Sequence, residues 1–218
     1  MKKLISLFSL VLLLLVATQS FAQIKFGVKT GLNITNMLSK NDDEKFSKDF
    51  VMKPGLHLGA TAELPISESF AMETGLLFSM KGYKYDKNDY RYTLNINYLE
   101  VPVNAVYKIN LEEISILLHT GPYLGYALSG KVKSDKEMFG ENGDKKKYTI
   151  KFGNNKDKDD MKPLDFGLNF GAGIGINSFI IDFQYGLGLA NLSPYTENRT
   201  KLKNKVIGIS IGYKFGNE

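Results

Sequence analysis

The chain has 218 residues, a formal net charge of +5 and no cysteine. This length fits one domain, and the lack of cysteine excludes disulfides and thiolate metal sites. The lysines alternate with aspartates and glutamates in loop-like runs, which argues against a nucleic-acid partner. After residue 22 no apolar run is long enough for a membrane-spanning helix.

The N-terminal segment has the pattern of a secretory signal peptide. A basic start and an apolar run over residues 4–17 are followed by the small residues Ser20 and Ala22 at the positions that flank a cleavage site. We therefore expect residues 1–22 to be a cleaved signal peptide and residues 23–218 to form one domain. An uncleaved anchor is the alternative, although the apolar run is shorter than the ~20 residues of a spanning helix.

Eight later stretches alternate between apolar and polar residues with the period of a β-strand. In the last stretch Ile209 and Ile211 share one face, whereas Gly208, Ser210 and Gly212 share the other. An interior lined by glycine and lysine cannot form a dry core, so the apolar face must contact lipid. The stretches cover residues 24–34, 55–64, 70–80, 94–107, 114–128, 164–176, 179–189 and 206–215.

Two of these stretches are irregular. In the fourth, Leu94, Ile96 and Tyr98 hold one parity, whereas the apolar residues from Leu99 onward hold the other. A β-bulge near Tyr98 would reconcile them. Alternatively, the residues before Tyr98 extend beyond the bilayer, where the alternation is no longer enforced. In the fifth stretch Pro122 has no N–H, so one ladder bond must be missing or bulged there.

The connectors alternate between long and short. The long ones are about 36–53, 81–91, 129–162 and 191–204, and the short ones are 65–69, 108–113 and 177–178. Bacterial barrels place short turns in the periplasm and long loops outside, which puts both termini in the periplasm. In lipid, only a helix or a closed barrel provides hydrogen-bond partners for all of its backbone N–H and C=O groups. We therefore predict an all-β fold, an eight-stranded antiparallel transmembrane β-barrel with up-and-down meander topology, in the cell outer membrane.

Aromatic residues are expected to form girdles at the two membrane interfaces. The outer girdle would contain Tyr83, Tyr85, Tyr90, Tyr92, Tyr98, Tyr123, Tyr126 and Tyr195. The periplasmic girdle would contain Phe70, Tyr107, Phe179, Tyr213 and Phe215.

Four segments carry a resemblance to a known family, namely residues 24–33, 98–102, 166–173 and 211–215. They resemble the PorT-like outer-membrane β-barrel family of Bacteroidota, and the segment containing Glu100 and Pro102 is the most specific. The resemblance implies an eight-stranded barrel and, for most members, no established activity. One branch is associated with protein secretion across the outer membrane. The chain departs from many such barrels because three residues follow Phe215, where those barrels end on the aromatic residue.

The predicted barrel interior carries charges of both signs. Side chains fill an eight-stranded barrel, so a diffusion pore is not expected. Buried charges persist only when they are paired, and we predict an internal salt-bridge network that includes Glu100 and acts as a structural plug. A proton or ion path is the alternative. The predicted members are Lys25, Lys29, Glu63, Glu73, Glu100, Asp182 and Lys214.

The two histidines are the candidates for catalysis. Both are expected to point inward, His57 near the outer rim and His119 near mid-barrel. A lipid hydrolase needs a histidine beside a serine and a carboxylate on the lipid-facing rim. We therefore expect a non-catalytic protein with a structural or interaction role, without cofactor or metal. A lipid-modifying enzyme and a soluble ligand-binding barrel, with its apolar face inside, are the alternatives.

The connector over residues 129–162 is longer than barrel closure requires, and such loops are usually functional or disordered. This connector contains a basic run, Lys145, Lys146 and Lys147, and an acidic cluster, Asp157, Asp159 and Asp160. It could contact anionic lipopolysaccharide, a cation or an envelope protein partner, although disorder is the stronger expectation and loosely spaced acids predict calcium poorly. The expected partners are therefore outer-membrane lipid and lipopolysaccharide, around a monomer that binds no nucleic acid.

Overall fold

The computed structural model describes residues 24–40, 49–87, 90–137, 139, 146–195 and 200–215. The expected signal peptide lies outside these residues. No helix in this part of the chain is long and apolar enough to cross a membrane.

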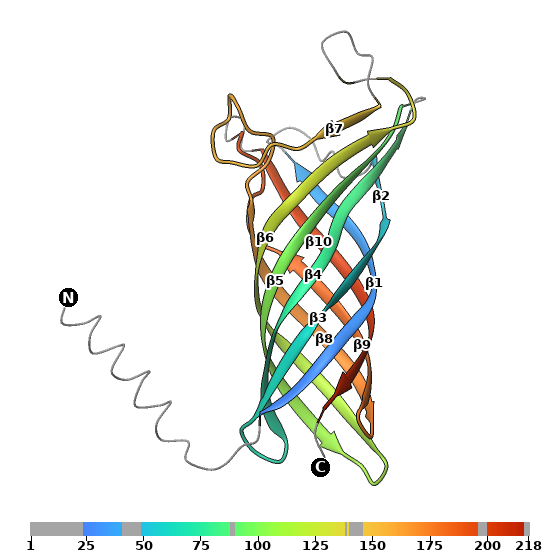
Figure 1. Cartoon of the computed structure of the whole chain (residues 1–218), viewed down its shortest axis with the longest axis vertical. Helices are drawn as coiled ribbons and strands as arrows, with labels where there is room; N and C mark the ends of the chain where they lie inside the picture. Colours follow the sequence, from blue (N-terminus) through green and yellow to red (C-terminus); the bar gives the residue numbers. More distant parts are fainter. Residues whose placement is uncertain are drawn as a thin grey trace, which may run out of the picture.

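Eight long strands form a closed ring in which each strand pairs antiparallel with its neighbours along the chain, and the last pairs with the first (Figure 1). The predicted up-and-down barrel is confirmed. Two short strands that the sequence did not predict, β2 (Phe50–Val51) and β7 (Lys147–Thr149), pair with β4 and β6. The ring consists of β1 (Lys25–Lys40), β3 (Lys53–Pro65), β4 (Phe70–Lys87), β5 (Tyr90–Asn110), β6 (Ile114–Ser134), β8 (Leu164–Ile176), β9 (Phe179–Gly188) and β10 (Lys201–Lys214).

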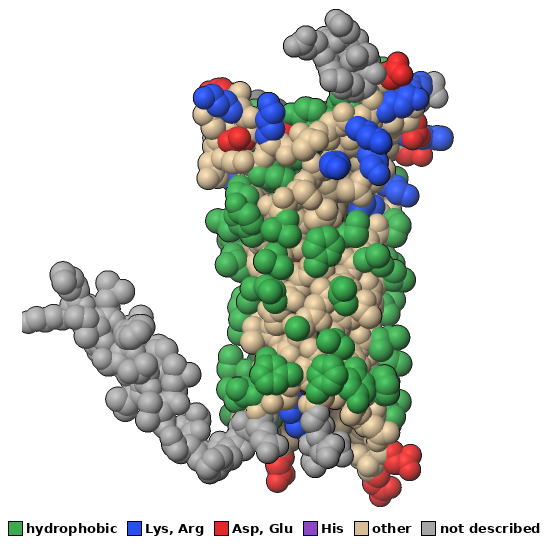
Figure 2. All heavy atoms as spheres, in the orientation of Figure 1, with side chains coloured by type: hydrophobic (Ala, Val, Ile, Leu, Met, Phe, Trp, Pro, Cys, Tyr) green, Lys and Arg blue, Asp and Glu red, His purple; other side chains and the backbone are tan. Residues whose placement is uncertain are grey.

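The apolar side chains cover the outside of the barrel (Figure 2). Phe166, Ile209 and Ile211 are 52%, 51% and 58% exposed, as a lipid-facing surface requires. The soluble barrel with an apolar interior is therefore wrong. Glycines on the inner face make room for larger polar groups: a Cβ at Gly31 or Gly171 would collide with the imidazole of His57 or His119.

The predicted irregularity near Tyr98 is present, but its consequence differs. The register between β5 and β6 shifts between Asn97 and Tyr98, and the extra residue, Leu128, belongs to β6. Strand β5 keeps its parity throughout, so Leu94, Ile96 and Tyr98 all point inward and are buried. The bulge therefore does not bring these three residues to the lipid face.

The prolines interrupt the strand ladders, as predicted for Pro122. Pairing of β5 with β6 stops at Pro102 and resumes at Ala105, and this gap includes the position opposite Pro122. Pairing of β4 with β5 has a similar gap beside Pro102. There the Thr74 hydroxyl donates a 2.7 Å hydrogen bond to the Pro102 carbonyl, which partly replaces the missing ladder.

Some predicted boundaries were wrong. The predicted loop over residues 81–91 is largely strand, because β4 continues to Lys87 and β5 begins at Tyr90. The two-residue turn after β8 is confirmed, and Asn177 adopts a φ of 52°, which asparagine tolerates.

Only one of the two aromatic girdles forms as predicted. At the periplasmic end exposed rings pair, with centroids 4.8 Å apart for Phe70 and Tyr107 and 5.0 Å apart for Phe179 and Tyr213. The outer girdle is wrong for Tyr98 and Tyr123, whose rings are buried inside the barrel.

Candidate functional site

The barrel interior is the candidate site, and its periplasmic end holds a cluster around Glu63. This carboxylate is 1% exposed and accepts hydrogen bonds from the ammonium groups of Lys108 and Lys214. Lys214 also lies 3.7 Å from a carboxylate oxygen of Glu73. Lys25 lines the same mouth, a cavity of about 640 Å³, without an ion pair to any described residue. The end facing the periplasm is therefore open and charged.

An apolar cluster lines part of the interior above this mouth. Ala71, Val106 and Leu117 are buried against one another, and Ile180 packs beside them. The cavity next to this cluster is also lined by Thr61, Glu73 and Lys214, so the cluster does not form a continuous apolar layer.

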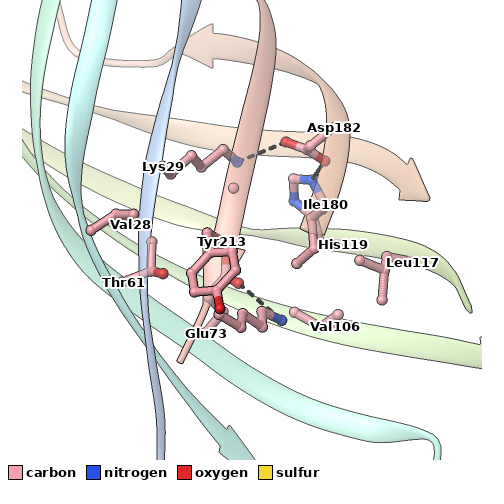
Figure 3. A pocket seen from close by; sticks show the side chains of 12 residues that line it. Val28, Lys29, Thr61, Glu73, Val106, Leu117, His119, Ile180, Asp182 and Tyr213 are labelled. Atoms are coloured by element: carbon pink, nitrogen blue, oxygen red, sulfur yellow. Dashed lines mark hydrogen bonds and ion pairs between the residues drawn. The ribbon is translucent and has the colours of Figure 1, made fainter. Parts of the chain in front are cut away.

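Asp182 organises the next layer. Its two oxygens contact Lys29 Nζ at 2.7 Å and His119 Nε2 at 2.8 Å (Figure 3). His57 does not contact Asp182, because its Nδ1 lies 2.9 Å from the side-chain oxygen of Asn33. The cavities on the two sides of this layer are each about 30 Å³, which is the space of roughly one water molecule.

Lys81 is the centre of the third polar cluster. It is 2% exposed, forms ion pairs with Glu100 and Asp165, and lies 4.3 Å from the centroid of the Tyr123 ring. Asp165 is fully buried and also accepts hydrogen bonds from Tyr123 Oη at 3.1 Å and Asn204 Nδ2 at 2.8 Å. All of these donors contact the same oxygen, Oδ2, so they replace only part of the water that the buried carboxylate has lost.

The loop end of the barrel is closed by an apolar plug. Ile150, Phe152 and further partly buried side chains pack against a buried core that consists of Met37, Leu94, Ile96, Tyr98, Ala127, Met161, Ala190 and Leu192. The backbone holds the plug in place, since Lys162 N donates to the Leu192 carbonyl and Ile150 N to the Gly130 carbonyl. The loop end is thus closed by an apolar plug, and the Asp182 and Lys81 clusters lie in the interior below it.

The connector expected over residues 129–162 begins later than predicted, because residues 129–134 belong to β6. Its described residues 146–162 are folded over the barrel. Asp160 accepts hydrogen bonds from the Tyr148 hydroxyl at 2.9 Å and from Lys151 N at 2.7 Å. Asp159 accepts one from Asn155 N at 2.8 Å. Two of the predicted acidic residues therefore stabilise the loop itself. Lys145 lies outside the described residues.

Six of the seven predicted interior residues lie in three clusters rather than in one network, and Lys25 lies at the open mouth without an ion pair to a described residue. Glu63, Glu73 and Lys214 are together, Lys29 pairs with Asp182, and Glu100 pairs with Lys81.

Sequence reasoning missed four members: Lys81, Lys108, His119 and Asp165. Lys81 and Lys108 fall in segments predicted as a loop and a turn, although their inward parity within longer strands would have identified them. His57, expected near the outer rim, lies deeper, at a cavity that both Lys29 and Lys81 line.

The described residues bring no three histidine, aspartate or glutamate side chains together as metal ligands. The search of curated proteins finds no match.

Solved outer-membrane barrels are similar in overall shape at low identity. Ail of Yersinia pestis, solved with the heparin analogue sucrose octasulfate, is 17% identical, with 88% of this chain and 99% of that chain covered and a TM-score of 0.42. Neisserial surface protein A is 13% identical, with 87% and 97% covered and a TM-score of 0.44. We draw no functional conclusion from likenesses at this level.

The sequence itself matches a family over most of its length. Residues 19–193 match the outer membrane protein beta-barrel domain, and the closed ring with an apolar exterior is the architecture that this description requires. The chain therefore belongs to the outer membrane protein beta-barrel domain family and is a protein of the outer membrane.

Proposed function

We propose that this protein is a closed, non-catalytic barrel whose role is structural or depends on contacts made by its outer surface. One observation carries the proposal: paired charges and an apolar plug fill the interior, leaving mid-barrel cavities of only about 30 Å³. A solute cannot pass such an interior, so a role beyond structure depends on the surface.

The histidines support a non-catalytic role over a lipid-modifying enzyme. His57 and His119 are held by Asn33 and Asp182 inside the barrel, away from the lipid-facing surface. The side-chain hydrogen bonds of His119 among the described residues include Asp182 but no serine or threonine hydroxyl, so the nucleophile of a triad is lacking there.

The loop end is the proposed contact surface. Residues 146–163 form an ordered cap, and Lys146 and Lys147 are exposed on it. With the termini in the periplasm this cap faces the cell exterior, where lipopolysaccharide or an envelope protein is the partner.

Membership of the PorT-like family is a separate proposal. Its most specific segment contains Tyr98, Glu100 and Pro102, and all three side chains point into the barrel. This segment therefore supports a shared interior with that family and gives no support to a role in secretion, which depends on a partner-binding surface.

Two measurements test the proposed function. Vesicles that contain the purified protein should not swell in arabinose or stachyose, because the interior is closed. Swelling at the rate given by a general porin would contradict the closed barrel. In intact cells, a photo-crosslinker at Lys146 should give lipopolysaccharide or a single protein adduct, and an adduct only from an equivalent position in the periplasmic turn at Glu112 would contradict the assigned surface.

A further inference from the structure

Outside the barrel, strand β5 marks the point where the wall leaves the hydrocarbon. Its outward residues change from Val101 and Leu99 to Asn97 and Asn95. Four residues separate Leu99 from Asn95, which is ~13 Å along a strand and ~10 Å along the membrane normal at a tilt of about 40°. The neighbouring outward residues of β4 and β6 are therefore at headgroup height or just above it.

Lysines from three strands converge at this height. The register places Lys84 opposite Thr93, Thr93 opposite Lys133, and Lys133 opposite Lys147. Lys131 lies opposite Asn95 in the row nearer the membrane. We call Lys84, Lys131, Lys133 and Lys147, together with Asn95 and Asn97, the lysine platform. Figure 2 shows basic side chains gathered above the apolar band on this face of the barrel.

The charge of the lysine platform is uncompensated within the described part of the chain. Its four lysines form no ion pair there, and the nearby Asp86 is already bound by Arg91 Nε at 2.9 Å. Like charges directly across a strand pair, as in Lys133 and Lys147, are destabilising on their own. An anion that binds between these strands would convert this repulsion into a favourable interaction.

The surroundings of the platform define the anion. Directly below it, Leu99, Tyr126 and Leu128 are exposed apolar side chains. Asn95 adds a hydrogen-bonding group between the lysines and this apolar surface, beside Asn97, whose Nδ2 donates a 2.9 Å hydrogen bond to the Ser129 hydroxyl. A ligand that matches this order carries phosphates, then sugar hydroxyls, then acyl chains.

We propose that the lysine platform is a binding site for the phosphorylated headgroup of an acylated glycolipid in the outer leaflet. The proposal rests on the proposed function, because it names the partner of an outer-surface contact. The lysines bind the phosphates, Asn95 binds the sugar, and the apolar surface below packs against the acyl chains.

A second set of outward lysines provides a matched control. Lys201, Lys203 and Lys205 follow one another along the single strand β10, and Lys205 lies 5.7 Å from the ring centroid of Tyr185. They have the same charge at the same end of the barrel, but no lysines converge on them from neighbouring strands of the ring apart from Lys40 beside Lys201.

The experiment compares two triple variants of the full-length protein in detergent micelles. Fluorescent bisphosphorylated lipid A is the probe, and lipid A without phosphates is the control ligand. We expect Lys84→Gln, Lys131→Gln, Lys133→Gln to weaken binding by roughly tenfold to a hundredfold, since each lysine near an anionic surface contributes about 1 kcal/mol. The triple variant Lys201→Gln, Lys203→Gln, Lys205→Gln should change it by less than about threefold.

Three outcomes would overturn the proposal. Equal losses in both triple variants would indicate a delocalised basic collar, and equal binding of lipid A without phosphates would exclude phosphate recognition. Absence of lipid A binding by the unaltered protein, with a protein adduct formed at Lys133 in cells, would assign the platform to a protein partner. None of these outcomes alters vesicle swelling, so a failed lipid site and a failed closed barrel are distinguishable.

Discussion

The middle of the barrel and its loop end close the same tube by opposite means. In the middle, Asp165 and Asp182 are buried with their partners, and the strands that carry them present apolar side chains to the outside. At the loop end, Leu94 and Ile96 form a dry core, and the wall outside them is polar. Apart from the cluster of Ala71, Val106 and Leu117, the interior is mainly polar where lipid surrounds the barrel, and it is apolar at the loop end.

Strand β5 passes through both regions without changing its parity. Glu100 points inward between the outward Leu99 and Val101, whereas Ile96 points inward between the outward Asn95 and Asn97. The inversion follows from which face meets lipid, because apolar side chains avoid water on either side of the wall. A switch of the apolar parity within one strand therefore marks the membrane boundary, and a bulge is not required to explain it.

The largest expected effect comes from breaking the ionic middle. Lys81→Met should lower the free energy of unfolding by about 3–5 kcal/mol, because Glu100 and Asp165 would remain buried without their cation. Urea unfolding in lipid vesicles, followed by far-UV circular dichroism, measures this. The control is Lys87→Met at the exposed ion pair with Asp49, with an expected change of about 0–1 kcal/mol. Equal effects of the two substitutions would contradict the assigned burial.

The apolar loop end should respond as a packed core. Ile96→Ala leaves a cavity at a fully buried position, and we expect a loss of about 2–4 kcal/mol in the same assay. The matched control is Ile109→Ala, on the lipid-facing side of the same strand and 39% exposed, with a smaller loss expected. A loss at Ile109 larger than that at Ile96 would show that the loop end is not packed.

Weakening the apolar plug at the loop end should not make the barrel conduct ions. In the double variant Met161→Ser, Leu192→Ser the plug is weakened, but the Lys81 and Asp182 clusters still fill the interior. We expect single-channel conductance in planar bilayers to stay at the background level. Stable porin-like openings in this variant would mean that the plug alone closes the barrel.

The smallest effect concerns the ladder gap at Pro102. Thr74→Val keeps the shape of the side chain but removes the 2.7 Å hydrogen bond to the Pro102 carbonyl, which should cost about 1 kcal/mol. Thr30→Val is the comparison, since its hydroxyl bonds the His57 carbonyl at a longer 3.2 Å, beside an intact ladder. A larger loss at Thr30 would contradict the role given to Thr74.

The fold was predictable from the sequence because lipid enforces strict alternation inside the membrane. Strands such as β8 and β9 match their predicted ranges for that reason. The outer ends of β4, β5, β6 and β10 were missed because alternation weakens once water meets the outer face. That error placed Lys81 in a loop and so removed the cation of the largest ionic cluster from the predicted site.

The sequence also did not allow us to predict which interior charges pair with one another. Parity predicts that Glu63, Asp182 and Lys214 point inward, but their partners depend on the strand register and on height along the axis. Lys25 has the correct parity and still lies at the open mouth without an ion pair to a described residue.

The central claim is that the wall of the barrel reverses its polarity along β5, and spin-label accessibility tests it most directly. The chain has no cysteine, so single cysteines at Val101, Leu99, Asn97 and Asn95 can be labelled in vesicles without background. We expect labels at Val101 and Leu99 to be relaxed by lipid-soluble oxygen and labels at Asn95 to be relaxed by a water-soluble nickel complex, with Asn97 between them. Equal accessibility of all four positions to the nickel complex would contradict the account.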